Sequence, residues 1–289
     1  GKFYEANTLS QWITTMQPRF PVVWEFHAWN MAYNISVVTN TKEERWDWVH
    51  KGIRLLRDRG IRLNPRAIKL YRELSWIYFH KINEVSDDAH WYYKKQVARE
   101  WQEIMGSPAF GQTTKQTIDA FRQITDAPKT QALLLEKSPE VVALLQELQT
   151  LGYSIEKVDQ RKKLLVALGQ LAMLNYLPQP IFSDYPLVHM PPEVPEGMTK
   201  VMQNASYAPA ITALLSYLRY HVLIESYHMN PAVMLDCMER FGPVDWRHPC
   251  AHSLYWAREA TIMAEGLRLR HEGQGIDFLN AYRQNIFSV

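Results

Sequence analysis

The sequence predicts an all-α protein. Segments with the 3.6-residue apolar period of amphipathic helices cover most of the 289 residues, whereas alternating strand-like patterns bounded by turn residues are scarce. Residues that start or stop helices fall between these segments. The predicted helices span residues 2–16, 22–36, 42–59, 66–83, 86–104, 113–125, 130–136, 139–150, 160–176, 207–228, 231–240, 249–270 and 274–287.

The breaks between these helices follow from residue types that cannot continue a helix or that cap its start. Pro and Gly interrupt the helical pattern, and an Asn, Ser or Asp before a helix can accept hydrogen bonds from its first N–H groups. These signals are Pro18 and Pro21, Gly60, Asn64 and Pro65, residues 86–88, residues 106–108, Ser138 and Pro139, and Asn230 and Pro231.

Residues 178–198, PQPIFSDYPLVHMPPEVPEGM, divide the chain. Six prolines among these 21 residues cannot sustain a helix, and the segment exceeds the usual connection between helices. We expect a Pro-rich strap or linker there, and a softer break near residues 106–111. The predicted domains are therefore residues 1–105, 106–177 and 199–289, with the strap at 178–198.

The composition is that of a globular protein, with 47% apolar and 21% charged residues. A net charge of only +2 argues against nucleic-acid binding, because neutralising phosphates needs a basic surface. Two cysteines, Cys237 and Cys250, are too few for a disulfide framework. A single disulfide between them remains an alternative. One long uncharged run, residues 201–218, contains Gln, Asn, Ser, Thr and Pro, so we expect a buried helix there and not a membrane span.

A repeat with a shift of 47 residues runs through the first hundred residues. Each copy has a Pro, an aromatic residue six positions later, a small residue at position ten and a Trp at position eleven, and a second helix follows. The matched pairs are Pro18 with Pro65, Trp24 with Tyr71, Ala28 with Ser75, and Trp29 with Trp76. Helix pairs at a fixed period predict an α-solenoid, because one pair cannot bury its apolar face alone.

The segment GIRLNPRAIKLYRELSWIYFHK, residues 60–81, resembles the tetratricopeptide repeat (TPR) family in a degenerate form. Leu70, Tyr71, Leu74 and Ser75 stand where that family has its first-helix pattern, although the period is 47 residues instead of 34 and Ser75 replaces the usual Gly. The resemblance covers about the first third of the chain, and Pro249 begins a weaker echo. It implies a TPR-like α-solenoid continued by a C-terminal helical domain.

Three phrases are similar to those of an uncharacterised group of bacterial proteins found in planctomycetes, verrucomicrobia and their relatives. They are WITTMQPRFPVVWEFHAWNMAYNISV, GIRLLRDRGIRLNPR and FGPVDWRHPCAHSLYWA. This likeness implies a segment upstream of Gly1, a membrane anchor, and a domain exported to face the periplasm. It implies no activity.

The stretch WEFHAWNMAYN, residues 24–34, concentrates aromatic rings in the first repeat. Trp24, Trp29 and Tyr33 recur at helical spacing, so we expect them to pack against the paired helix. His27, Asn30 and Asn34 share a different face.

The resemblance to TPR proteins implies that this second face lines a groove for a peptide, gripped through Asn side chains. Tyr71 and Arg72 of the second repeat complete the candidate partner-binding set of His27, Asn30, Asn34, Tyr71 and Arg72. The alternative is that Asn30 and Asn34 cap or bridge neighbouring helix ends.

Within the predicted helices an acid-x-x-His pattern occurs three times, and on a helix such residues share one face, as the ligands of di-iron bundles do. The pairs are Asp47 with His50, Asp87 with His90, and Glu225 with His228. His221 extends the last pair to positions i, i+4 and i+7 of a helix. His221, Glu225 and His228 are therefore metal-site candidates, whereas Asp87 is explained equally well as a helix cap.

A second candidate metal cluster lies in RHPCAH, residues 247–252, where His248, Cys250 and His252 are suitable zinc ligands. The simpler interpretation is a turn that leads into a helix. A further hypothesis makes Cys250 a nucleophilic thiol whose pKa is lowered by a helix N-terminus.

The chain contains no Gly-rich phosphate loop, G-x-S-x-G, H-E-x-x-H or haem-attachment motif. The leading hypothesis is a non-enzymatic scaffold or subunit of a larger assembly, without a cofactor, that binds a protein or peptide in a helical-repeat groove and is tethered to a membrane by an upstream segment. The alternative is a metal-binding helical protein with a redox or di-metal site.

Overall fold

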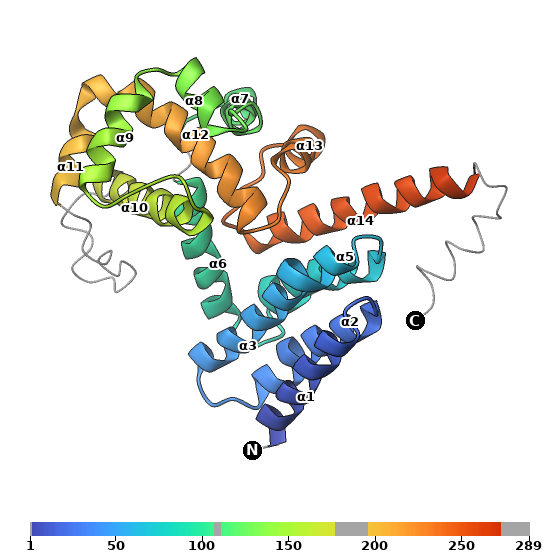
Figure 1. Ribbon diagram of the computed structural model, residues 1–289. Helices are drawn as coiled ribbons and strands as arrows, with labels where there is room; N and C mark the ends of the chain where they lie inside the picture. Colours follow the sequence, from blue (N-terminus) through green and yellow to red (C-terminus); the bar gives the residue numbers. More distant parts are fainter. Residues whose placement is uncertain (1, 107–110, 177–195, 273–289) are drawn as a thin grey trace. The chain divides into compact units, whose positions relative to one another are not determined.

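The computed structural model describes residues 2–106, 111–176 and 196–272. Every regular element of these residues is helical, which confirms the predicted all-α class. Figure 1 shows the helices along the chain. They form two compact units, one made of residues 1–98 with 248–289 and the other of residues 99–247.

This division differs from the predicted domains, because the last long helix belongs with the first hundred residues. Helix α14 (Pro249–Glu272) runs alongside α5 (Ile68–Trp76), as Figure 1 shows. The Ser75 hydroxyl donates a hydrogen bond to the Ser253 carbonyl at 2.9 Å. Most of the predicted strap lies outside the described residues, and its last three residues begin helix α11 (Glu196–Gln203).

Unit 1 contains the two predicted helical hairpins and α14. Three of its helical segments continue as π-helix, in which the turn widens by one residue. In chain order the elements are α1 (Lys2–Met16), α2 (Pro21–Trp29), the π-helix η1 (Asn30–Ile35), α3 (Lys42–Arg54), the π-helix η2 (Leu55–Gly60), α4 (Ile61–Leu63), α5, the π-helix η3 (Ile77–Asn83) and the first half of α6 (His90–Met105).

The 47-residue repeat is confirmed by the register of these elements. Helix α2 changes to π-helix after Trp29, and α5 makes the same change after Trp76, which is 47 residues later. A π-helical segment is uncommon and is often found at functional sites. Its recurrence at equivalent positions shows that both hairpins share one local geometry.

A matching pair of hydrogen bonds explains the aromatic residue six positions after each proline. The Trp24 indole donates to the Pro18 carbonyl at 2.9 Å, and the Tyr71 hydroxyl donates to the Pro65 carbonyl at 2.9 Å. The Asn64 amide also donates to the Pro18 carbonyl, at 2.8 Å. The aromatic residue thus holds the turn before its own helix, and Asn64 ties the two repeats together.

The expected stripe of Trp24, Trp29 and Tyr33 is only partly buried. Trp24 is fully buried, as is Ala28 four residues later, but Trp29 is 40% exposed. Five residues along an α-helix turn about 140° past the starting direction, so Trp29 points away from the core that Trp24 enters. The assignment of Trp29 to the core was therefore wrong.

Unit 2 surrounds a long apolar helix, α12 (Ala208–Glu225), which packs against α7, α9 and α10. The helix cap predicted at Asn230 is present at the start of α13. The Asn230 side chain accepts a hydrogen bond from Ala232 N, next to Pro231 at the first helical position. The elements of unit 2 are the second half of α6, α7 (Thr114–Thr125), α8 (Gln131–Lys137), α9 (Val141–Thr150), α10 (Val158–Tyr176), α11, the 3-10 turn η5 (Ala205–Tyr207), α12 and α13 (Pro231–Phe241).

Candidate functional site

The five predicted partner-binding residues do not form one exposed surface. His27 and Tyr71 are buried in the core of unit 1, so they cannot contact a partner. Burial lowers the pKa of His27 to about 4, which makes it a neutral core histidine. Asn34 and Arg72 are exposed and Asn30 is half-buried. The Asn34 amide donates to the Asn30 side-chain oxygen at 2.9 Å, so the two asparagines act as a bonded pair.

Beside this pair, unit 1 carries a continuous series of stacked rings, which we call the aromatic row. It consists of Trp29 and Tyr33 from the first repeat and Trp76, Phe79 and His80 from the second. Trp29 stacks on Tyr33 with centroids 5.6 Å apart, and Trp76 stacks on His80 at 5.0 Å. Tyr33 and His80 join the two repeats at 5.8 Å, and Phe79 extends the row from Trp76 at 6.0 Å.

The aromatic row is repeated as well as exposed. Trp29 corresponds to Trp76 and Tyr33 to His80 under the 47-residue shift, and each pair is four residues apart on its own helix. The solvent-exposed fractions are 40% for Trp29, 46% for Trp76 and 40% for Phe79. Sequence reasoning missed this surface because it placed Trp29 in the core, although the four-residue spacing of the stacked pairs was visible.

Charged groups underlie the aromatic row. Burial raises the pKa of Glu73 to about 7, with the nearby Glu25 carboxylate adding to the rise. Burial, together with the Glu73 and Glu84 carboxylates, also raises the pKa of the Tyr33 hydroxyl. The Lys81 ammonium lies 5.4 Å from the centre of the Tyr33 ring, within cation–π range. The row is therefore an apolar surface with a proton-titratable carboxyl beneath it.

A buried ion pair supports the second repeat. The Lys81 ammonium lies 2.5 Å from the Asp87 carboxylate, and both side chains are at most 5% exposed. The other Asp87 oxygen accepts a hydrogen bond from Ala89 N at 2.8 Å, just before α6 begins at His90. Asp87 thus caps a helix start, as one of the two sequence interpretations predicted, and it is not placed for metal binding with His90.

The candidate metal set His221, Glu225 and His228 is not assembled. Helix α12 ends at Glu225, so His228 lies beyond the helix, with a positive φ of 52° and its Nδ1 atom 3.1 Å from the Ile224 carbonyl. The Glu225 carboxylate accepts three hydrogen bonds from the Arg161 guanidinium, from Nε at 3.0 Å and from Nη2 at 2.9 and 3.0 Å. His221 also reaches Glu225, at 3.0 Å. The carboxylate is therefore used in a salt bridge.

The second candidate cluster is likewise dispersed. His248 is exposed and its Nδ1 accepts a hydrogen bond from Cys250 N at 3.2 Å, at the start of α14. His252 is fully buried and stacks on Tyr78 at 4.8 Å. Within the ranges that the structure describes, no three His, Cys, Asp or Glu side chains converge as a metal site would require.

Cys250 is not an activated thiol. Burial raises its pKa, although Lys94 and a hydrogen bond with Asn83 act in the opposite direction. The helix N-terminus was expected to lower this pKa, whereas the net shift is upward. Cys237 is fully buried, and neither cysteine forms a disulfide.

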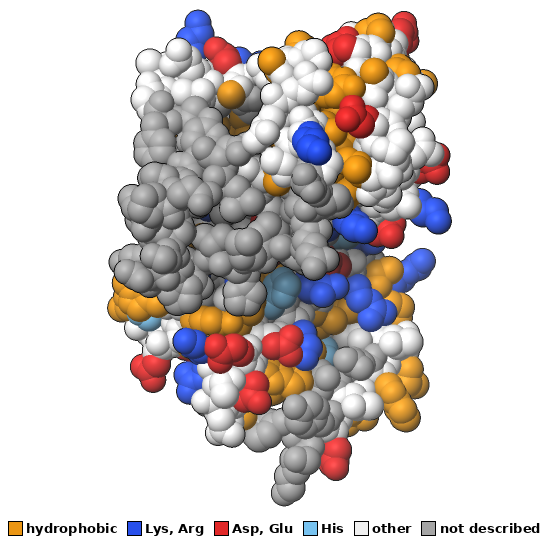
Figure 2. Space-filling view, turned by 90° about the vertical axis from the view of Figure 1, so that its left-hand side faces the viewer, with side chains coloured by type: hydrophobic (Ala, Val, Ile, Leu, Met, Phe, Trp, Pro, Cys, Tyr) orange, Lys and Arg blue, Asp and Glu red, His pale blue; other side chains and the backbone are white. Residues whose placement is uncertain are grey.

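The surface charges agree with the small net charge. On the face that Figure 2 shows, acidic and basic side chains of the described residues are interspersed with hydrophobic ones. Among the helices of residues 2–106, 111–176 and 196–272, none is long and apolar enough to cross a membrane.

Comparison with protein-family models, with curated proteins and with solved structures found no match to this chain.

Proposed function

We propose that this protein is a non-enzymatic helical scaffold that binds a partner protein through the aromatic row of unit 1. The observation that carries the proposal is the exposed, stacked ring pair that recurs in both repeats. Monomeric proteins rarely expose contiguous large apolar groups unless these form an interaction site. Tyr and Trp are also the residue types that dominate the binding energy of protein interfaces.

The partner we propose is a helical or extended segment that covers the row lengthwise. Equivalent rings supplied by consecutive hairpins present evenly placed anchors, which suits a linear ligand. Asn30 and Asn34 lie beside the row and offer amide groups to the backbone of such a segment, and the exposed Arg72 offers a charge. The buried Lys81–Asp87 pair supports the row from below, so the rings need little ordering on binding.

We further infer that the two hairpins belong to a TPR-like array whose groove receives the partner. The shared α-to-π register and the paired hydrogen bonds to Pro18 and Pro65 support a repeat built to be stacked. In this proposal the protein is a subunit of a larger assembly.

The double variant Trp29→Ala, Trp76→Ala is expected to lose the partner. Each Trp removed from an interface centre costs about 2 kcal/mol, so affinity should fall by about two to three orders of magnitude. Tagged protein would be incubated with lysate of the native host, and captured proteins would be quantified by mass spectrometry.

The matched control is Trp91→Ala, because Trp91 is 73% exposed and lies outside the aromatic row. A protein captured by wild type and by this control, but not by the double variant, supports the proposal. Equal capture by all three proteins contradicts it.

Metal content distinguishes the scaffold from the metal-binding alternative. The described His, Cys, Asp and Glu side chains do not converge, so protein purified without added metal is expected to contain well under one equivalent of transition metal. Elemental analysis by mass spectrometry after brief chelation measures this directly. One or two equivalents that survive chelation would favour the metal-binding protein.

A further inference from the structure

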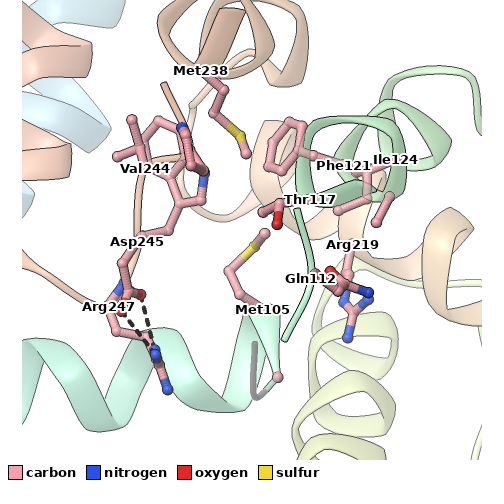
Figure 3. A pocket seen from close by; sticks show the side chains of 14 residues that line it. Met105, Gln112, Thr117, Phe121, Ile124, Arg219, Met238, Val244, Asp245 and Arg247 are labelled. Carbon is pink, nitrogen blue, oxygen red and sulfur yellow. Dashed lines mark hydrogen bonds and ion pairs between the residues drawn. The ribbon is translucent and has the colours of Figure 1, made fainter. Parts of the chain in front are cut away.

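Unit 2 contains a pocket that plays no part in the proposed scaffold function. It has a volume of about 450 Å³ and lies among the end of α6, helices α7, α12 and α13, and residues 243–247. This size is typical of sites for small molecules. Figure 3 shows its apolar side chains, which include Met105, Phe121, Ile124, Met238 and Val244.

Two arginines line the pocket, and they are in different electrostatic states. Arg247 is neutralised, because its guanidinium makes two hydrogen bonds with the Asp245 carboxylate, at 2.9 and 2.8 Å, and a third with Gln102 at 2.8 Å. Arg219 makes a hydrogen bond from Nε to the Ile104 carbonyl at 3.1 Å. Among the described residues, no carboxylate forms an ion pair with it. In Figure 3 the Asp245–Arg247 pair and Arg219 lie on separate sides of the pocket.

The backbone at Gly106 leaves space for the Arg219 guanidinium. Gly106 has a positive φ of 76°, and a Cβ atom there would lie 3.0 Å from a terminal nitrogen of Arg219. Burial lowers the pKa of Arg219 to about 10, which is still high enough for the group to be charged at neutral pH. Arg219 is half-buried, and a charge that is partly removed from water without a counter-charge is costly to the fold. An anionic ligand would remove that cost.

We propose that this pocket binds a small monocarboxylic acid with an apolar body, whose carboxylate pairs with Arg219. Because Nε of Arg219 is already used, the two terminal nitrogens remain, and their N–H groups match the two oxygens of a carboxylate. The Met, Phe, Ile and Val side chains then receive the apolar part.

The charge balance favours a monocarboxylate over a phosphate group. Arg219 supplies one uncompensated positive charge, and the second arginine of the pocket is satisfied by Asp245. A phosphate monoester carries close to two negative charges at neutral pH. One cation is therefore matched by one carboxylate.

The test compares 4-phenylbutyrate with its neutral amide, 4-phenylbutanamide, by titration calorimetry on the full chain. The two probes share shape and apolar area, so the difference isolates the charge. We expect the acid to bind wild type about tenfold or more tightly than the amide, and Arg219→Gln to remove that preference. Arg240→Gln is the matched control, because Arg240 lies on α13 outside the pocket and pairs with Asp236.

Thermal unfolding gives a second readout that does not depend on the variant binding anything. Without ligand, Arg219→Gln should unfold at the same temperature as wild type or higher, because an uncompensated charge has been removed. With 4-phenylbutyrate, wild type and Arg240→Gln should shift upward and Arg219→Gln should not.

Three results would overturn the proposal. The first is wild type binding the acid no more tightly than the amide, which is decisive even if Arg219→Gln does not fold. The second is inorganic phosphate binding as tightly as the acid, which would indicate a general anion site. The third is no measurable binding of the acid at millimolar concentration.

Discussion

Replacing Gly169 by Ala is expected to lower the free energy of unfolding by about 3 kcal/mol. Gly169 lies in α10, and a Cβ atom there would be 2.4 Å from the Glu103 carbonyl oxygen and 3.2 Å from its carbon. Both atoms are backbone atoms of α6, so no side chain can rotate to relieve the overlap. The helix would have to move, which also threatens the bond from the Gln170 amide to the Glu103 carboxylate at 3.0 Å.

The direction of this effect is informative, because helix propensity alone predicts the opposite. Ala is favoured over Gly inside a helix by about 1 kcal/mol. Gly266→Ala in α14 is the matched control, since nothing lies within 4 Å of a Cβ atom at that position. It should raise stability slightly. Urea denaturation followed by circular dichroism measures both variants, and hydrogen exchange assigns the loss to α6 and α10. A Gly169→Ala protein as stable as wild type would contradict the close approach of these helices.

Replacing Asp87 by Asn is expected to cost about 3 kcal/mol, because it leaves the buried Lys81 ammonium without its partner. The same change also weakens the cap at the start of α6, where Asp87 accepts the hydrogen bond from Ala89 N. The aromatic row lies above Lys81, so local loosening there should also weaken partner binding. The measurement is the urea midpoint, with ring contacts followed by tryptophan fluorescence.

Asp47→Asn is the matched control for charge, since the Asp47–Lys51 pair is 60% and 49% exposed and such surface pairs contribute about 0.5 kcal/mol or less.

The contribution of Asp87 to stability should also depend on pH. Its hydrogen bonds with Lys81 and Ala89 and the Lys81 charge hold its pKa below the usual 3.8, despite burial. The stabilisation is therefore complete above pH 3.8 and is lost as the pH falls below that value towards the folded-state pKa. Equal stability of the Asp87→Asn and Asp47→Asn variants would show that the pair is not buried in solution.

Part of the candidate site could be predicted from the sequence. The 47-residue spacing identified both hairpins, and the aromatic residues six positions after Pro18 and Pro65 were recognised as equivalent. Asn30 and Asn34 were correctly placed together on one face, where they bond to each other. The neighbouring rings were misassigned, because Trp29 was placed in the core with Trp24. His27 and Tyr71 were also misassigned, since both are buried and cannot contact a partner.

The residues of the first metal set are not brought together for a different reason. That set depended on where α12 ends, and the predicted helix was extended three residues too far, to His228. Helix ends are set by competition among weak local signals, and here Asn230 and Pro231 start the next helix only five residues after Glu225. Sequence spacing also could not reveal that Arg161, 64 residues away, forms a salt bridge with Glu225.

The order of polar, apolar and helix-breaking residues was enough to establish the helical class, most helix positions and the repeat, because these depend on contacts within a few residues along the chain. The tertiary structure alone decided which helices share a unit, which rings stay exposed and which charges lack a partner. Helix α14 joins α5 across 178 residues of sequence between Ser75 and Ser253. Among the described residues, the fold brings no carboxylate into an ion pair with Arg219, and spacing along one chain carries no record of such distances.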